Sequence, residues 1–299
     1  MKFSIVVPSL NQAPFLGACL DSLLIQKEVD LEIIVRDGGS SDSSVEILRG
    51  YGNRIVWTSE PDGGQSAAIN AGMRQVSGDL MGYLNSDDVL LPGALKKVQQ
   101  SFEKKPDLDL VYGDAHHIDE NGQVIGEYRT LPWGASQLGA QCIICQPAAF
   151  WTRTLWQRVG EFDCSLHCSF DYDYWIRMFR SGAKVAHVEK ILAGSRDYES
   201  TKTRSQRGLI YREIIQLQRH HLGRAHAQWF YEYLCYLKWE HGGRLSGTIP
   251  SNLNTLLMLA KFLSKLTGRS RKETKDFFSI PPQRFDQRIT GVLTAEDSS

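Results

Sequence analysis

Residues 82–91 read Gly-Tyr-Leu-Asn-Ser-Asp-Asp-Val-Leu-Leu, and the predicted fold is organised around them. Apolar residues stand on both sides of a polar centre that holds the adjacent carboxylates Asp87 and Asp88. The pattern predicts a buried strand that ends at these polar residues. Two neighbouring carboxylates are costly to bury unless a positive group meets them, and a divalent cation such as Mg²⁺ or Mn²⁺ would do so. The alternative is an N-cap, because a helix is predicted to begin near Pro92.

Short apolar runs alternate with helical patterns around this stretch. Strands are predicted at residues 3–8, 31–36, 55–58, 80–84 and 108–112, and helices at 16–25, 44–48, 66–75 and 92–104. This alternation is typical of a doubly wound, mostly parallel α/β sheet flanked by helices. Ligands of such sheets bind beyond the carboxyl ends of the strands, so we expect Asp37, Gln65 and Asp87 to converge on one crevice.

The second half of the chain is less regular. We predict a hairpin at 124–129, a buried strand at 142–151 that Pro147 interrupts, a helix at 172–178 and a last strand at 184–188. Residues 205–239 are helical and aromatic-rich, and 253–266 form an amphipathic helix. These helices either pack on the sheet domain or lie on a membrane. The predicted organisation is a domain at 1–203, a basic helical segment at 204–290 and a disordered polar tail at 291–299.

The charge of the chain is unevenly spread, although its net charge is zero over 299 residues. Residues 200–275 carry 14 Lys and Arg against 4 Asp and Glu, a balance of +10, whereas residues 1–199 have a balance of −8. A basic segment of this kind suggests an anionic partner such as a membrane surface, a polyphosphate or nucleic acid, unless it is simply a solvated helical face. No secretory signal and no apolar run of about 18 residues is seen, which predicts a soluble or peripheral protein.

Six cysteines occur in the sequence. Cys142 and Cys145, and Cys164 and Cys168, come close to the spacing of a zinc site. The first pair stands in the apolar run Cys-Ile-Ile-Cys without a turn glycine, which favours ordinary buried thiols over zinc.

Several motifs together resemble glycosyltransferase family 2, of GT-A fold. They are Ile-Val-Val-Pro-Ser-Leu-Asn at 5–11, Val-Arg-Asp-Gly-Gly-Ser-Ser-Asp at 35–42, Gly-Gln-Ser-Ala-Ala-Ile-Asn-Ala-Gly at 64–72 and Leu-Asn-Ser-Asp-Asp at 84–88. Gln-Pro at 146–147 and the segment 162–177, which contains Asp-Tyr-Asp, extend the likeness over roughly residues 1–203. Each motif alone is weak, but their order and spacing are specific.

The resemblance implies a binding site for a nucleotide-sugar. It places residues in three groups: Pro8, Ser9 and Asn11 lining the nucleotide pocket, Asp37 accepting a hydrogen bond from a uracil-like or thymine-like base, and Gln65 and Asn70 along the ribose and diphosphate. Asn85, Ser86 and Asp87 stand where the family has its Asp-x-Asp motif, with Asp87 as the ligand of Mg²⁺ or Mn²⁺. Asp171 stands at the general base; the alternative is that it caps the helix at 172–178.

Two departures from the family pattern concern the metal. Asn85 removes one charge from the motif, and Tyr198 stands near a place where the family often has a His ligand. Both would weaken metal binding, and Arg196 and Lys202 are expected to offset this by taking part of the diphosphate charge.

The function that the resemblance implies is inverting transfer of a sugar from a nucleotide-sugar, UDP- or dTDP-linked, to a sugar or lipid-linked glycan in surface polysaccharide synthesis. A cytoplasmic enzyme, peripheral on the inner membrane face and without a nucleic acid partner, would fit. A nucleotidyltransferase would show a Gly-rich loop with Arg and Lys after the first strand, and residues 8–11 lack one. A dinucleotide fingerprint is also absent there. A non-catalytic carbohydrate- or nucleotide-binding protein stays an alternative.

Overall fold

The computed structural model describes residues 1–240, 248–250, 252–268 and 272–280. The chain divides into two compact units, of which the first comprises 1–130 and 144–198 and the second comprises 131–143 and the residues from 199 onward. The second unit thus includes a segment from the middle of the chain, which no sequence pattern indicated. The predicted disordered tail at 291–299 lies outside the described residues.

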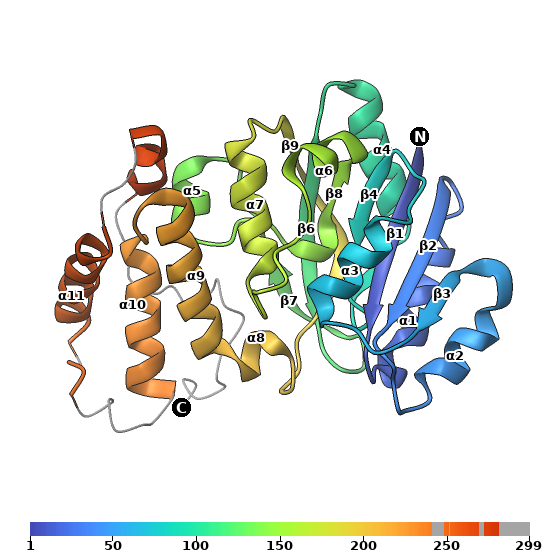
Figure 1. The fold of residues 1–299 in the computed structure, drawn as a ribbon, viewed down its shortest axis with the longest axis horizontal. Helices are drawn as coiled ribbons and strands as arrows, with labels where there is room; N and C mark the ends of the chain where they lie inside the picture. Colours follow the sequence, from blue (N-terminus) through green and yellow to red (C-terminus); the bar gives the residue numbers. More distant parts are fainter. Residues whose placement is uncertain (241–247, 251, 269–271, 281–299) are drawn as a thin grey trace. The chain divides into compact units, whose positions relative to one another are not determined.

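The first unit is built on a sheet in which nine strands of the described chain take part (Figure 1). Their order is β3-β2-β1-β4-β8-β6-β9-β5, and β7 pairs with β6. The strands are β1 (Lys2–Ser9), β2 (Asp30–Asp37), β3 (Val56–Ser59), β4 (Leu80–Tyr83), β5 (Val89–Leu90), β6 (Leu110–Ile118), β7 (Val124–Tyr128), β8 (Ala149–Thr152) and β9 (Val185–Arg196).

The sheet has a parallel half and a mixed half. β1 pairs in parallel with β2 and β4, and β2 pairs in parallel with β3. β8 runs antiparallel to β4 and β6, and β7 closes the predicted hairpin with β6, whereas β6 and β9 are parallel. The predicted mostly parallel α/β fold is therefore confirmed, with antiparallel strands added beyond β4.

Helices cover both faces of this sheet (Figure 1). Those of the first unit are α1 (Ala13–Leu24), α2 (Ser44–Tyr51), α3 (Gln65–Met73), α4 (Ala94–Lys104), α6 (Arg153–Val159) and α7 (Phe170–Arg180), with short 3₁₀ turns at η1 (Gly52–Arg54) and η2 (Gln146–Ala148). Helices α1, α2 and α4 contribute to the main apolar core on one face. Helix α3 packs on β1 and β2, and α6 packs on α7 and β8.

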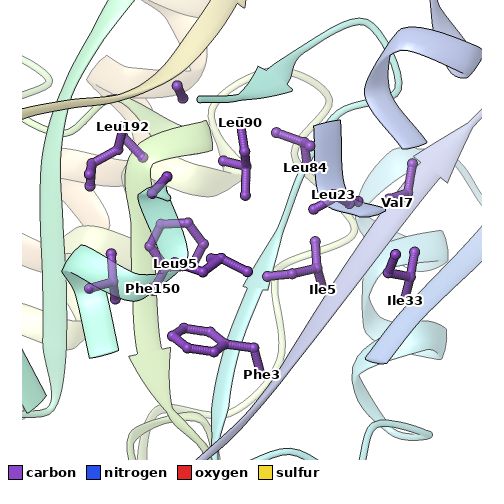
Figure 2. Packing of buried hydrophobic residues seen from close by; sticks show 14 of the residues in the cluster. Phe3, Ile5, Val7, Leu23, Ile33, Leu84, Leu90, Leu95, Phe150 and Leu192 are labelled. Atoms are coloured by element: carbon purple, nitrogen blue, oxygen red, sulfur yellow. The ribbon is translucent and has the colours of Figure 1, made fainter. Parts of the chain in front are cut away.

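The main core lies between β1 and the helices on that face. Phe3, Ile5 and Val7 alternate along β1, so all three point to one side of the sheet. Figure 2 shows them with Leu95 of α4 and Phe150 of β8 in one apolar cluster. Each side chain is at most 2% exposed. Burial of this alternating pattern positions the ends of β1, β2 and β4 at one edge.

The opposite face depends on a glycine and on aromatic rings. A Cβ atom at Gly72 of α3 would lie 2.5 Å from Cγ1 of Val6, so only glycine lets α3 approach β1 this closely. Further along, Trp151 of β8 packs edge-on against Phe162 and Tyr174, with ring centroids 6.2 and 5.7 Å away. These rings hold α7 against the sheet.

Three local predictions are corrected. The strand predicted at 142–151 is wrong for its first part, because η2 contains Pro147 and the strand β8 begins only at Ala149. The strand predicted at 184–188 continues to Arg196 as β9, which pairs with the unpredicted strand β5. The N-cap alternative for Asp87 or Asp88 is wrong, since α4 begins at Ala94 and its N-cap is Gly93, with φ +70°.

The second unit is helical in its described part. It contains α5 (Ala135–Ala140), α8 (Lys202–Ser205), α9 (Arg207–Leu222), α10 (Ala227–Cys235), the π turn η3 (Tyr236–Glu240), α11 (Leu253–Leu266) and the 3₁₀ segment η5 (Lys272–Phe278). The helical pattern predicted at 205–239 is broken at Gly223, whose φ of +85° ends α9. Among the described residues, no helix is both long enough and apolar enough to cross a membrane.

Candidate active site

The first component of the site is the loop after β2. Asp37 ends this strand next to Ser9, the last residue of β1, and is 2% exposed. Its carboxylate accepts hydrogen bonds from Ser40 N at 2.9 Å, Ser40 Oγ at 2.5 Å and Ser59 Oγ at 2.6 Å. These bonds fix the loop and hold the carboxylate in a buried position at the carboxyl edge of the sheet.

The loop after β1 is tied to the loop after β2. Asn11 has φ +52°, a left-handed conformation that Asn tolerates better than most residues. Its Oδ1 accepts a hydrogen bond from Ser41 N at 2.8 Å, and its own N donates to Ser40 Oγ at 2.7 Å. Beside it, Ser9 Oγ is buried and has no hydrogen-bond partner among the described residues. The structure thus brings Pro8, Ser9 and Asn11 together with Asp37 at the carboxyl edge of the sheet.

The Asp pair after β4 is divided between two environments. Asp88 is 4% exposed, and its Oδ1 accepts a hydrogen bond from the backbone N of Arg196 at 2.8 Å. Burial, and then the charge of Asp87, raise the pKa of Asp88 well above its usual value. Asp87 is half-buried, and its Oδ2 accepts a hydrogen bond from the Tyr198 hydroxyl at 3.1 Å. Asp88 therefore anchors β9, while Asp87 keeps solvent access.

Arg196 supplies positive charge behind the pair. It is 7% exposed, and its Nε donates to the carbonyl of Asp87 at 2.7 Å while Nη1 donates to the carbonyl of Asp119 at 2.6 Å. Its guanidinium also lies over the ring of Phe15, 4.7 Å from the centroid. These contacts fix the orientation of the guanidinium behind the Asp pair. Lys202 belongs to the second unit, and its part in the site stays a prediction.

Amide side chains join three elements at this edge. Gln65, the first residue of α3, donates from Nε2 to Asn85 Oδ1 at 2.7 Å. Asn85 Nδ2 lies 3.3 Å from Asp88 Oδ2 and 3.4 Å from Gln146 Oε1. Gln146 in turn donates to the carbonyl of Tyr83 at 2.7 Å. Gln65 and the Asn85 motif thus meet as predicted from the sheet edge, with Ser86 buried between Asn85 and Asp87.

Asn70 is engaged with the backbone of a distant residue. Its Nδ2 donates to the carbonyl of Phe162 and its Oδ1 accepts from Phe162 N, both at 2.9 Å. The side chain is 1% exposed. Asn70 therefore fixes the loop that leads to α7, and its predicted contact with the ribose would need this clamp to open.

Asp171 stands in the first turn of α7. The helix begins at Phe170, with Ser169 at the N-cap, so Asp171 is not the cap that the alternative required. Its partly exposed carboxylate accepts a hydrogen bond from Tyr172 N at 2.7 Å. Phe170 packs against Tyr83 of β4 with ring centroids 6.2 Å apart, which brings the start of α7 near the end of that strand.

Asp173 differs from Asp171 although both lie in the same turn. It is 3% exposed and forms an ion pair with Arg177 at 2.7 Å. Arg177 also donates to the carbonyls of Val159 and Glu161. Asp173 is therefore a structural residue that ties α7 to the loop before it.

The donor set fits a divalent cation that is shared with phosphate. Among the described residues, no group of three or more His, Cys, Asp or Glu side chains could hold a metal by itself, and this includes the four cysteines near zinc spacing. Mg²⁺ is commonly held by one or two carboxylates together with substrate phosphates, and half-buried Asp87 offers one such carboxylate. The pKa of Tyr198 is raised to about 12 by burial and by Asp87, so its hydroxyl remains a donor to Asp87 at neutral pH.

A separate cavity of about 390 Å³ lies at the other end of the sheet. It is lined by Met1, by Asp79 and Leu80 at the start of β4, and by Arg153. None of the candidate active-site residues lines this cavity. Its position at the amino ends of the strands separates it from the polar edge.

Sequence reasoning missed two parts of this site. It assigned no role to Gln146, although the Gln-Pro pair was noted, and it did not connect Arg196 with Asp88. The signal for Arg196 was the apolar run at 191–193, which continues β9 after the charged residues Glu189 and Lys190.

Comparison with known proteins places this geometry in a family. The sequence pattern of "Glycosyl transferase family 2" matches residues 4–155, about half of the chain. A PGL/p-HBAD biosynthesis glycosyltransferase of Mycobacterium bovis (strain BCG / Pasteur 1173P2) is 31% identical over 202 residues, which are 64% of this chain and 75% of that protein. A chondroitin synthase of Pasteurella multocida (strain Pm70) is 30% identical over 191 residues, 63% of this chain. The chain spans only 20% of that synthase.

Solved structures share the fold at low identity. S. aureus TarS 1-349 in complex with UDP-GlcNAc has a TM-score of 0.58 and 16% identity, covering 93% of this chain and 84% of its own. The mannosyltransferase PcManGT from Pyrobaculum calidifontis, in complex with GDP-Man and Mn²⁺, has a TM-score of 0.59 and 17% identity, covering 87% and 75%. These likenesses confirm the predicted GT-A-type fold. With the family pattern spanning the strands that carry the Asp pair, the chain belongs to glycosyl transferase family 2.

Proposed function

We propose that the protein transfers a sugar from a nucleoside diphosphate sugar to a hydroxyl acceptor, with inversion at the anomeric carbon. The observation that carries this proposal is the division of the Asp pair. Asp88 is turned inward to the backbone of β9, whereas Asp87 stays half-buried at the carboxyl edge of β4. An oriented, accessible carboxylate at that edge suits a diphosphate-bound cation.

The donor would lie along the loops after β1 and β2. Ser9 Oγ is a buried polar atom without a protein partner in the described chain, so it is available to a ligand. Asp37 would meet the base of a UDP- or dTDP-linked sugar, and Gln65 would lie nearest the diphosphate. Binding of UDP-GlcNAc by TarS and of GDP-Man by PcManGT supports a nucleotide-sugar donor.

The residues fit Mg²⁺ or Mn²⁺ at Asp87, and such an ion supplies Lewis-acid stabilisation of the leaving diphosphate. The chain's own part is orientation: Tyr198 holds one carboxylate oxygen of Asp87, and Arg196 holds its backbone carbonyl. Asn85 contributes a neutral amide where a second charge would otherwise stand.

Asp171 is the proposed general base. Its carboxylate is partly exposed at the start of α7, and this helix is held at the end of β4 by Phe170. Asp171 would accept the proton of the acceptor hydroxyl from the side opposite the leaving group, which single-displacement inversion requires.

The acceptor is proposed to be a sugar or lipid-linked glycan of a surface polysaccharide, used by a cytoplasmic protein that contacts the inner membrane face. The names of the chondroitin synthase and of the PGL/p-HBAD biosynthesis glycosyltransferase are consistent with glycan or glycolipid synthesis. The balance of +10 over residues 200–275 favours an anionic surface.

Calorimetric titration of UDP with and without Mn²⁺ tests the site. Asp87→Ala should abolish the Mn²⁺-dependent part of binding, and Tyr198→Phe should weaken it about tenfold, as loss of a group that orients a metal ligand commonly does. Tyr51→Phe is the matched control, because Tyr51 bonds Gly17 and Asp21 away from this edge. Unchanged Mn²⁺-dependent binding in Asp87→Ala would refute the assignment. Release of UDP from a UDP-sugar by the wild-type protein separates an enzyme from a pure binder.

A further inference from the structure

Helix α11 presents two different apolar faces. One face is buried: Leu256 and Ala260 are fully covered and pack with Tyr231 and Leu234 of α10. Figure 1 shows α10 and α11 side by side within the second unit. The other face is open, since Met258 is 72% exposed. Packing within the described unit thus covers only part of the apolar surface of α11.

The open face is a continuous row. Met258, Phe262 and Leu266 are 72%, 57% and 65% exposed and follow each other at intervals of four residues. Four residues turn an α-helix by about 40° beyond a full circle, so the three side chains lie along one side of α11. Lys261 and Lys265 are exposed one position earlier and flank the row. We call these five residues the α11 strip.

All charged side chains of the α11 strip are positive. Helix α11 contains two lysines and no Asp or Glu. It also lies inside the region with a balance of +10. An apolar row flanked by lysines is the arrangement of helices that lie in the interface of an anionic bilayer. The side chains of such a row enter the acyl boundary while the ammonium groups meet lipid phosphates.

We propose that the α11 strip is the surface that docks on an anionic lipid bilayer, with Met258, Phe262 and Leu266 inserted and Lys261 and Lys265 on the phosphates. The inference rests on the proposed peripheral membrane contact and assigns it to one helix. A second copy of the chain suits the strip less well. A symmetric pairing would bring four ammonium groups together, and three side chains fall short of the roughly 800 Å² per partner of a standard interface.

Vesicle sedimentation with the full chain tests the assignment. Wild-type protein should bind vesicles of phosphatidylcholine with 30% phosphatidylglycerol far better than pure phosphatidylcholine (a mixture chosen at about the anionic content that polybasic surfaces need). Met258→Ser with Phe262→Ser should raise the half-saturating lipid concentration about tenfold or more. Lys261→Gln with Lys265→Gln should weaken binding and flatten its dependence on salt.

The matched control is Val124→Ser with Ile125→Ser on β7, whose side chains are 57% and 53% exposed in the first unit. This pair also replaces two adjacent exposed apolar side chains by serine, and it should leave vesicle binding unchanged. Equal effects of the α11 and β7 pairs would overturn the assignment. So would a concentration-dependent dimer in analytical ultracentrifugation that Met258→Ser with Phe262→Ser dissolves, because the strip would then be an interface between copies.

Binding of UDP distinguishes a failure of the membrane inference from a failure of the proposed transferase function. Mn²⁺-dependent binding of UDP should be the same in wild type and in both α11 variants, and their circular dichroism melting curves should coincide. Wild-type protein that ignores anionic vesicles but binds UDP with Mn²⁺ would overturn the membrane inference and leave the proposed transferase function standing. Wild-type protein that binds anionic vesicles but does not bind UDP would overturn the proposed transferase function and leave the membrane inference standing.

Discussion

Asp87 and Asp88 are adjacent in sequence, yet their carboxylates differ in hydrogen-bond partner and in exposure. Asp88 is committed to the backbone of Arg196, and Asp87 is held by Tyr198 with solvent access left over. Asp171 and Asp173 repeat this division in one turn of α7, where Asp173 is paired with Arg177. Residues distant in sequence separate the roles of the first pair, whereas in the second pair the partner Arg177 lies four residues further along the same helix.

Asp171→Asn should lower turnover by about 10²–10⁴-fold, because the amide keeps the shape but cannot take the acceptor proton. Donor binding should change little, since Asp171 lies outside the loops that would hold the nucleotide. Steady-state kinetics with a UDP-sugar and calorimetry with UDP measure the two effects separately. Retained turnover, or a product with the donor's anomeric configuration, would remove Asp171 from the mechanism.

Asp173→Asn is the matched control within the same turn. It breaks the buried ion pair with Arg177, so it should cost about 1–3 kcal/mol of unfolding free energy. Its effect should appear in urea unfolding rather than in the chemical step measured at a temperature where the variant is folded.

At the scale of elements, the site depends on helices that approach the sheet closely. Helix α3 carries Gln65 at its first turn and lies against β1 at Gly72. Strand β9 carries Arg196 to the Asp pair by pairing with β5. Without the packing of α3 on β1, or the pairing of β9 with β5, the polar side chains of the site would move apart although their residue types stayed the same.

Gly72→Ala should therefore destabilise the protein, by about 1–3 kcal/mol, because the added methyl would lie 2.5 Å from Cγ1 of Val6 in a packed core. Gly50→Ala in α2 is the matched control: no atom lies within 4 Å of its Cβ position. That change should be neutral or stabilising by up to about 1 kcal/mol. Equal unfolding midpoints for the two variants would show that α3 does not need its close contact.

At the scale of the whole molecule, the amino ends of the strands are joined by one carboxylate. Glu32 of β2 accepts hydrogen bonds from Ser4 Oγ at 2.6 Å, Ser77 N at 2.8 Å and Ser77 Oγ at 2.8 Å, and it pairs with Lys2 at 3.3 Å. Although burial opposes ionisation, these bonds lower the pKa of Glu32 to about 2. The charged form is therefore favoured in the folded state.

Glu32→Gln should destabilise the protein at pH 7 by about 2 kcal/mol. A depressed pKa contributes stability above the unfolded value of 4.5, and this stability is lost as the pH falls from there towards about 2. The difference in unfolding free energy between wild type and variant, measured in urea, should thus shrink to about half near pH 3. Glu46→Gln, on the exposed pair with Arg49, is the control and should change stability by less than about 0.5 kcal/mol. A gap that is constant with pH would contradict the role of Glu32.

The fold class and the edge at which the site lies could be predicted from local sequence patterns. The continuous apolar run of β1 and the alternation of strands with helices are local patterns, and the carboxyl ends of parallel strands must meet at one edge. Asp37, Gln65 and Asp87 could be placed there for that reason, whereas Asn11 was placed only by the motif resemblance. The motif resemblance supplied their roles.

The tertiary structure alone decided which polar groups are already committed. Asp37, Asn70 and Arg196 form hydrogen bonds with other groups of the protein, and Asp88 accepts one from the backbone of β9. No local pattern reveals this, because the partners lie up to 109 residues away along the chain. Burial and hydrogen bonding depend on which segments meet, and that is settled by packing of the whole sheet. The same reason explains why the sequence could show that α11 is amphipathic, but not that its Met258 face remains uncovered in the described unit.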